Sequence, residues 1–266
     1  MADKKRVNWF FKFIAVIAYM IILAPMFVIV IVSFNSTEVI TFPPEGWSMR
    51  WYANIFAENS KFVTGFINSV KVATIATFFD IVIGVLASIS VTKYSFKQRG
   101  LLISLFTSPM FIPAIAFGFV LLQMTASLRI LTPFMKILIG HIIIILPYII
   151  RNTLGILTSY DWTIEDAAAS LGANPVRVFF QITLPIIKPA VLSGALLAFL
   201  YSFDEAVIAS FLTSAKFTTL PVQIINYMEF SFDPTVAAIS TILMAMSLVL
   251  MIIMDKFIGL DALTKQ

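Results

Sequence analysis

The sequence predicts an all-α membrane protein with six transmembrane helices. Of its 266 residues, 60% are hydrophobic and only 12% are charged, which is about half the charged fraction of soluble domains. About 20 apolar residues suffice for a helix to cross a bilayer, and the apolar runs of this chain are long enough for six such helices. We expect one transmembrane domain over residues 1–266, with spans at about residues 10–34, 62–92, 101–126, 134–157, 187–212 and 234–258.

Composition excludes several classes of function. The chain has no cysteine and one histidine, His141, so disulfide scaffolds, thiol catalysis and Cys/His zinc sites are ruled out, and we expect no metal site. The formal net charge is +4, but the Lys and Arg residues form no continuous stripe of the kind that binds nucleic acid. Membrane proteins carry excess basic residues in their cytoplasmic loops, so we expect a lipid bilayer and no nucleic-acid partner.

The first span follows a basic cluster at residues 4–6 and occupies the apolar run 9–34. That run is too long for the hydrophobic region of a secretory signal and has no A-x-A cleavage site, so we expect it to be retained. Residues 35–61 are polar and rich in Pro and Trp. Because aromatic side chains favour the headgroup region, this segment is expected to be an external loop along the membrane surface.

Spans three and four contain helix-breaking residues. Pro109, Pro113 and Gly118 interrupt span three, which is tolerated in a membrane only where neighbouring helices satisfy the freed backbone groups. We therefore expect this span to be kinked and buried in the bundle. In span four we expect His141 to be a hydrogen-bonded bundle residue rather than a proton relay.

The distribution of basic residues gives the orientation. With six spans, most of the 18 Lys and Arg residues fall on the side of the two termini. Because cytoplasmic loops carry the excess of Lys and Arg, both termini are predicted to be cytoplasmic. The loop 158–186, between spans four and five, then lies on the cytoplasmic face.

This loop has the local chemistry of a helix-turn-helix. Thr163 followed by Asp166 is a variant of the capping box that starts a helix. Gly172 is expected to end that helix, and Asn174 to cap a second one that has proline at its first position. Leu184–Pro185 is expected to stop the second helix before span five.

The first helix of the loop carries small side chains, Ala167 to Ala169, beside the Gly172 turn. Small residues allow another backbone to approach closely. Two readings follow: docking into a groove of a partner, or tight contacts within the same chain.

The same loop carries a seven-position motif. An acidic residue is followed by two alanines, three variable positions, a glycine, nine variable positions and Ile-x-Leu-Pro, here Asp166, Ala167, Ala168, Gly172, Ile182, Leu184 and Pro185. In this motif the chain resembles the permease subunits of binding-protein-dependent ABC importers. Asp166 stands where the family usually has Glu, and Glu165 lies beside it.

The resemblance implies a type I ABC importer permease, a non-catalytic transport subunit whose cytoplasmic coupling helix contacts an ATPase. The residues implied in ATPase coupling are Glu165, Asp166, Ala167, Ala168, Gly172 and Ala173. The chain lacks a G-x-x-x-x-G-K-[ST] phosphate-binding loop, so this chain should bind no cofactor, and ATP and Mg should be used by a partner. The implied partners are two cytoplasmic ATP-binding subunits, a second permease, and a periplasmic or extracellular solute-binding protein, at a bacterial plasma (inner) membrane.

Weaker similarities extend along the chain. Residues 41–48, 51–52, 68–69, 108–113, 202–205 and 220–222 look like the spermidine/putrescine branch of these permeases. In that branch two different permeases pair. The resemblance implies import of a polyamine by alternating access, with another small solute as the alternative.

Acidic residues within the spans are candidates for the substrate pathway. Asp204 and Glu205 lie in span five, where a carboxylate near the bilayer centre costs about 2.5–3.5 kcal/mol on insertion scales. Neighbouring helix positions are about 100° apart, so one carboxylate can face a pathway while the other contacts a neighbouring helix. Tyr148 and Tyr201 could attract a cationic substrate through cation–π contacts, and Asp80 in span two is a further candidate.

Three alternatives remain from the sequence. The carboxylates can be structural, paired with Lys71, Arg151 or a base of a partner subunit. An ATP-independent secondary transporter could bind a coupling ion with the same acids, but it would show matching broken helices in two halves, and we find no convincing repeat. An intramembrane enzyme is disfavoured because two adjacent residues of one helix diverge, whereas a catalytic pair of carboxylates must converge on one substrate.

Overall fold

The computed structural model describes residues 9–57, 60–128 and 130–258. All named elements in these ranges are helices, joined by loops that contain two isolated bridges. Five of the helices are long and apolar enough to cross a membrane, and a bent pair makes a sixth if it counts as one span. The basic cluster at residues 4–6, which precedes the first span, lies outside the described residues.

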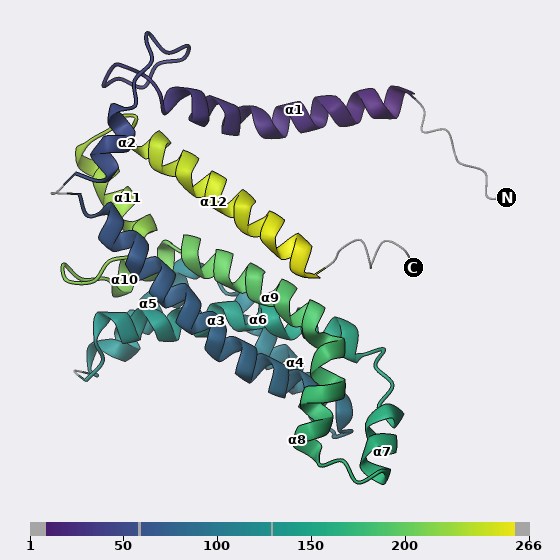
Figure 1. Cartoon of the computed structure of the whole chain (residues 1–266). Coiled ribbons are helices and arrows are strands. Elements are labelled where there is room, and N and C mark those ends of the chain that lie inside the picture. Colours follow the sequence, from purple (N-terminus) through teal and green to yellow (C-terminus); the bar gives the residue numbers. More distant parts are fainter. Residues whose placement is uncertain (1–8, 58–59, 129, 259–266) are drawn as a thin grey trace. The chain divides into compact units, whose positions relative to one another are not determined.

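The chain divides into two compact units (Figure 1). The first unit comprises residues 1–60 and 226–248, with α1 (Trp9–Val32), α2 (Arg50–Ile55), the end of α11 (Leu220–Phe230) and most of α12 (Thr235–Ile258). Most apolar residues of α1 are exposed, whereas Val32 at its end is buried. Trp51 of α2 is buried, and its indole Nε1 donates to the carbonyl of Asn35 at 2.6 Å.

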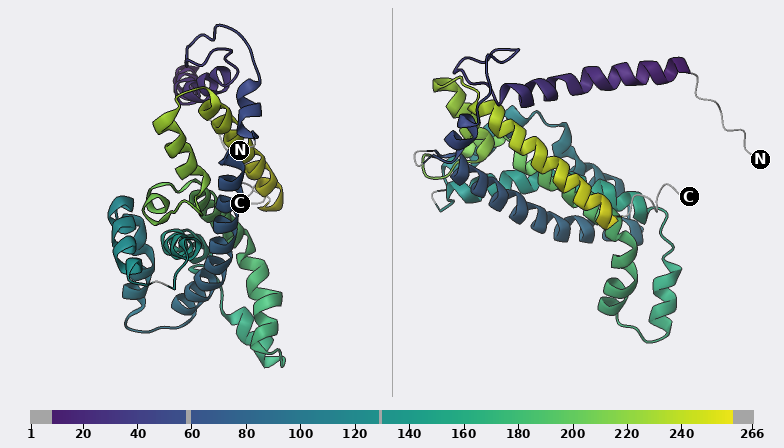
Figure 2. Two further views of the ribbon diagram at one scale, coloured as in Figure 1. Left: turned by 90° about the vertical axis from the view of Figure 1, so that its left-hand side faces the viewer. Right: turned by 45° about the horizontal axis from the view of Figure 1, so that its top comes forward.

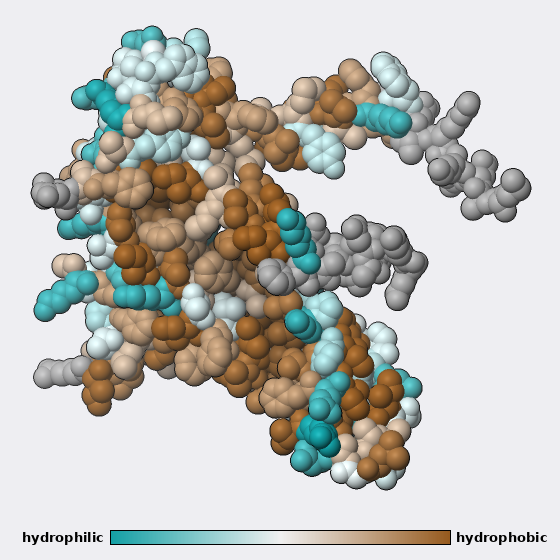
Figure 3. Space-filling model, in the orientation of Figure 1, coloured by the Kyte–Doolittle hydropathy of each residue, from teal (hydrophilic) through white to brown (hydrophobic). Residues whose placement is uncertain are grey.

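The second unit comprises residues 61–225 and 249–266, and its core is formed by three helices. These are α3 (Phe62–Lys93), α6 (Pro133–Leu157) and α9 (Leu184–Asp204), which pack against one another in all three pairings (Figures 1 and 2). Hydrophobic side chains cover much of the helical surface, as a membrane-spanning bundle requires (Figure 3).

Ile149 of α6 lies where these three helices meet. It is fully buried, and a Cβ atom added to Gly84 of α3 would be only 2.7 Å from its Cγ2. A Cβ added to Gly194 of α9 would be 3.1 Å from its Cα. The two glycines therefore allow α3 and α9 to approach α6 closely, as small residues commonly do between membrane helices.

The third expected span is broken rather than kinked. In place of one helix over 101–126, the structure has α4 (Arg99–Thr107), the short 3-10 helix η1 (Ser108–Phe111) and α5 (Ala114–Ala126), with α4 and η1 bent by 103° from α5. Pro113 offers no N–H, and it holds Ile112 before it in an extended conformation with ψ of 128°. Gly118 of α5 is buried, but neither α4 nor η1 contains a buried residue, so the expectation of a span buried in the bundle is not met by its first half in this chain.

The fifth expected span has different ends. We expected Leu184–Pro185 to stop the preceding helix, but α8 (Pro175–Val178) continues through a π-helical turn, η2 (Phe179–Thr183), into α9. The N–H of Leu184 still bonds to the carbonyl of Phe179, so the proline falls where the hydrogen-bond pattern is already changing. At its other end α9 stops at Asp204 rather than residue 212, and a separate helix α10 (Val207–Leu212) follows.

Candidate functional site

The expected helix-turn-helix is present and projects from one end of the α3–α6–α9 core (Figures 1 and 2). Its first helix is α7 (Thr163–Ser170) and its second is α8. Gly172 has φ of 86°, a conformation that costs a residue with a Cβ considerably more than glycine. Asn174 Oδ1 accepts from the backbone N–H of Arg177 at 2.8 Å, which is the predicted cap.

The start of α7 differs from the expected capping box between Thr163 and Asp166. Asp161 Oδ1 instead accepts from the backbone N–H of Thr163 at 3.0 Å and from its hydroxyl at 2.7 Å. These hydrogen bonds hold the pKa of Asp161 below its usual range. The side chain of Thr163 is thus hydrogen-bonded to Asp161, and Asp166 does not form the expected capping box with it.

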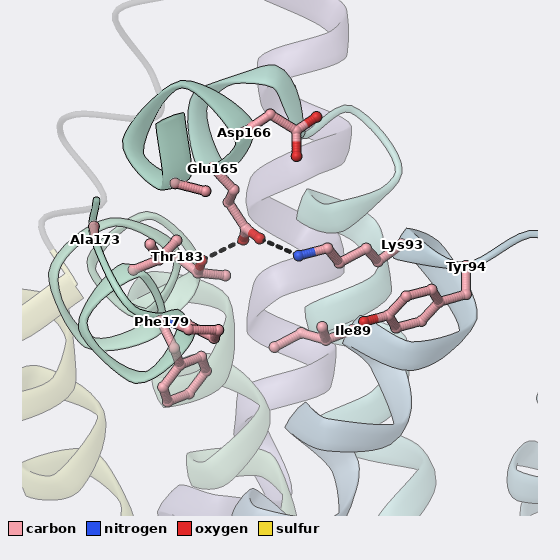
Figure 4. A pocket seen from close by; sticks show the side chains of 11 residues that line it. Ile89, Lys93, Tyr94, Glu165, Asp166, Ala173, Phe179 and Thr183 are labelled. Atoms are coloured by element: carbon pink, nitrogen blue, oxygen red, sulfur yellow. Dashed lines mark hydrogen bonds and ion pairs between the residues drawn. The ribbon is translucent and has the colours of Figure 1, made fainter. Parts of the chain in front are cut away.

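Glu165 and Asp166 are neighbours with opposite environments (Figure 4). Glu165 is only 7% exposed, its Oε2 lies 2.6 Å from Nζ of Lys93, and its Oε1 accepts from the hydroxyl of Thr183. Asp166 is exposed. Both were expected among the ATPase-coupling residues, but only Asp166 presents its carboxylate at the surface of this chain.

Two aromatic residues complete the surroundings of Glu165. The hydroxyl of Tyr160 lies 3.5 Å from Glu165 Oε1, and burial raises the pKa of this hydroxyl. The rings of Tyr160 and Trp162 meet edge to face at 4.7 Å, and Nζ of Lys93 lies 5.5 Å from the centre of the Trp162 ring. The Lys93–Glu165 pair therefore sits in a partly apolar surrounding.

A cleft of about 250 Å³ adjoins this ion pair, lined by the end of α3, by α7 and by α8 with η2. Lys93, Glu165 and Thr183 line it together with Ala169 and Ala173 (Figure 4). Lys93 and Thr183 are functional candidates that sequence reasoning missed. In the sequence Lys93 is only one of the basic residues that indicate the orientation, and Thr183 occupies a variable position of the motif.

The small residues of this helix-turn-helix (residues 163–178, the hairpin from here on) are accessible to solvent in part or in full. Ala167 and Gly172 are exposed, and Ala168 and Ala173 are half-buried. A Cβ at Gly172 would meet no atom within 4 Å. This glycine is therefore needed for its backbone conformation and not for a close contact within the described chain.

Glu205 lies at the break between α9 and α10. It is buried, and its two carboxylate oxygens accept from the backbone N–H groups of Ile208 at 2.9 Å and Ala209 at 3.0 Å. Its Oε2 lies 3.7 Å from Nε2 of His141. The partners of Glu205 are therefore these two N–H groups and His141, and not Lys71 or Arg151. We expected one carboxylate of the Asp204–Glu205 pair to contact a neighbouring helix, and Glu205, beside His141 of α6, is that residue.

His141 is hydrogen-bonded within the bundle, as expected. It is fully buried, and its Nδ1 lies 2.7 Å from the hydroxyl of Ser202 on α9. The histidine thus links α6 to α9.

The remaining pathway candidates fall into two places. Tyr148 and Tyr201 lie together, with ring centres 5.3 Å apart, and both line a small cavity of about 100 Å³ beside the broken third span. Asp204 is exposed and follows Tyr201 by three positions on α9, so the two share a helix face. Asp80 is elsewhere: it is fully buried in α3, and no described residue hydrogen-bonds to either carboxylate oxygen.

Comparisons with known proteins agree on one family. Residues 80–258 match the family model described as "Binding-protein-dependent transport system inner membrane component". The chain is 31% identical to the putrescine transport system permease protein PotI of Escherichia coli K12, over 87% of this chain and 84% of that protein. It is 30% identical to the spermidine/putrescine transport system permease protein PotC of Haemophilus influenzae, over 89% and 91%. Among solved structures, a chain of a bacterial ABC transporter involved in the import of the acidic polysaccharide alginate matches with a TM-score of 0.71 at 12% identity, covering 95% of this chain and 96% of that one.

Proposed function

Because the chain belongs to the family of binding-protein-dependent transport system inner membrane components, we propose that it is the membrane-spanning subunit of an ATP-driven importer of a polyamine, putrescine or spermidine. A separate binding protein would deliver the solute, and alternating access would carry it across a bacterial inner membrane. The similarity to PotI and PotC over most of their length supports this substrate class. The transport of another small solute by the same machinery is the alternative.

The proposed topology has six spans and cytoplasmic termini, in a type I architecture. The helices α1, α3, α6, α9 and α12 supply five spans, and the bent pair α4 and α5 supplies the sixth. The excess of Lys and Arg on the side of the termini supports the orientation.

The single observation that carries the coupling proposal is the exposed motif face of the hairpin. Asp166, Ala167 and Gly172 are exposed on a helix-turn-helix that projects from the end of the core. Two cytoplasmic ATP-binding subunits would bind such hairpins, one on this chain and one on a second permease, and would use the ATP and Mg. Ala168 and Ala173 are half-buried and would contribute at the edge of the contact.

For the pathway, we propose Asp204 with Tyr201 and Tyr148. Asp204 is exposed on the same helix face as Tyr201, and the two tyrosine rings face one another beside the α4–α5 break. A carboxylate beside aromatic rings attracts an ammonium group through charge pairing and cation–π contact. Asp80 is fully buried in this conformation, so a pathway role for it requires that α3 moves.

The test is uptake of labelled putrescine and spermidine by liposomes containing the permease pair, the ATPase and the binding protein. Asp166→Lys should lose both ATPase co-purification and uptake. Asp204→Asn should keep the ATPase bound but reduce polyamine uptake about tenfold or more, since a hydrogen bond to a charged group contributes about 1.5–3 kcal/mol. Glu229→Lys and Glu229→Gln, at an exposed carboxylate of α11, are the matched controls and should change neither property.

Two results would overturn the proposal. Uptake that persists without any ATPase would remove the importer mechanism. Binding-protein-stimulated ATP hydrolysis without uptake of either polyamine would remove the substrate while keeping the permease.

A further inference from the structure

The carboxylate of Glu165 connects three segments of the cytoplasmic end of the second unit. Glu165 belongs to α7, its Oε2 pairs with Lys93 at the last residue of α3, and its Oε1 accepts from Thr183 in the π-helical turn η2. Figure 4 shows both contacts converging on this one side chain, while Asp166 beside it takes part in neither.

The Lys93–Glu165 ion pair is partly shielded from solvent. The side chain of Glu165 is 8% exposed and that of Lys93 34% exposed, so solvent screens this pair less than it screens a pair on an open surface. Removing Lys93 leaves the charge of the buried Glu165 carboxylate uncompensated. The adjoining cleft separates parts of α3 from α7 and α8, so side chains and not continuous backbone packing make much of this connection.

The hairpin has a covalent link to α9 but none to α3. Because α8 runs through η2 into α9, any movement of the hairpin reaches α9 directly. Among the residues that the structure describes, α7 is hydrogen-bonded to α3 and to η2 through Glu165 alone, which accepts from Lys93 and from Thr183.

We propose that the Lys93–Glu165 pair is a clamp that makes α7 and the cytoplasmic end of α3 move as one body. Displacement of the hairpin would then be passed to α3 as well as to α9. Glu165 is in this view a positioning residue and not a contact of the ATPase. The inference rests on the proposed function, because it presumes that an ATPase moves α7.

The first test measures the number of solute molecules imported per ATP hydrolysed. Glu165→Gln and Lys93→Met should lower this ratio below the wild-type value while the ATPase subunit still co-purifies, because the exposed face around Asp166 is unchanged. The control is Lys97→Met, at an exposed lysine four residues beyond Lys93, which should leave the ratio unchanged. The exchange Lys93→Glu with Glu165→Lys should recover part of the loss.

The second test measures the relative movement of α3 and the hairpin directly. Since the chain has no cysteine, spin labels can be placed on Ser90→Cys in α3 and Leu171→Cys in the hairpin, both at exposed positions. The distance between the labels should be the same in nucleotide-free and nucleotide-trapped complexes. In the Glu165→Gln background it should differ between the two states.

The outcomes separate the clamp from the importer function. A label distance that changes between states as much with the clamp intact as with Glu165→Gln overturns the clamp, as does an unaltered import ratio in the clamp variants. Either result leaves ATP-driven uptake by the wild-type protein in place. Absence of ATP-driven uptake by the wild type overturns the proposed function instead.

Discussion

Replacing Gly84 by alanine tests whether the α3–α6–α9 core depends on close approach of its helices. The new methyl would lie 2.7 Å from Ile149 Cγ2 and 3.0 Å from its Cβ, whereas carbon atoms in contact prefer about 3.5–4.0 Å. The helices would have to separate by about 1 Å, a gap that forfeits about a quarter to a half of each contact's attraction. Overpacking of this kind costs about 1–3 kcal/mol.

Ile149→Ala supplies the second arm of a double-mutant cycle. It removes the Cγ2 atom that the new methyl would meet, and alone it should cost about 2 kcal/mol, the low end for such truncations. The low end is expected because membrane helices associate by packing and not by escape from water. In the double variant the space left by Ile149 accepts the methyl of residue 84, so its cost should be lower than the sum by at least about 1 kcal/mol.

The assay is the free energy of unfolding, measured by titrating micelles of the protein with a denaturing detergent and following far-UV circular dichroism. Gly155→Ala is the control, because this glycine lies in α6, the helix of Ile149, and a Cβ there meets no atom within 4 Å. It should be neutral or slightly stabilising, since alanine is the better helix former. If the costs of Gly84→Ala and Ile149→Ala simply add, within about 0.5 kcal/mol, the close-approach argument is refuted.

Two further predictions concern the ends of helices. Glu205→Ala leaves two buried N–H groups of α10 without an acceptor, so it should destabilise the protein by about 1–3 kcal/mol per group. Glu205→Gln keeps one acceptor oxygen and should cost about half as much. Equal costs of the two variants in the unfolding titration would contradict this. Gly172→Ala places a Cβ at φ of 86°, which costs about 1–2 kcal/mol, so amide hydrogen exchange over residues 163–178 should quicken about tenfold; Gly172→Asn should be milder, and unchanged exchange in the alanine variant would count against the strain.

The apolar runs predicted the helical class and the presence of five to six long apolar helices, because length and hydropathy decide whether a helix can cross a bilayer. The effect of each proline on its helix was harder to predict. Pro113 breaks a helix, whereas Pro185 lies within a continuous one. The difference depends on the hydrogen-bond pattern of the preceding residues, and a π-helical turn before Pro185 has no local sequence signal that we could read.

The site was predictable as a segment but not residue by residue. Spacing placed the turn at Gly172 and the cap at Asn174 correctly, because both follow from local backbone chemistry. The spacing could not predict which of Glu165 and Asp166 is buried, since that depends on the position of Lys93, 72 residues away. In the same way Glu205 was distinguished from Asp204 only by where α9 ends.

The π-helical turn also restricts the length of the chain around it. A turn of this kind contains about one residue more than an α-helical turn, and each residue advances a helix by about 100°. Deleting one residue between Pro175 and Leu184 would therefore swing everything before it around the axis of α9 by about a quarter of a circle. The carboxylate of Glu165 would then no longer face the ammonium of Lys93. Among descendants of this sequence, insertions and deletions should consequently be tolerated at the hairpin's tip far more readily than in this stretch.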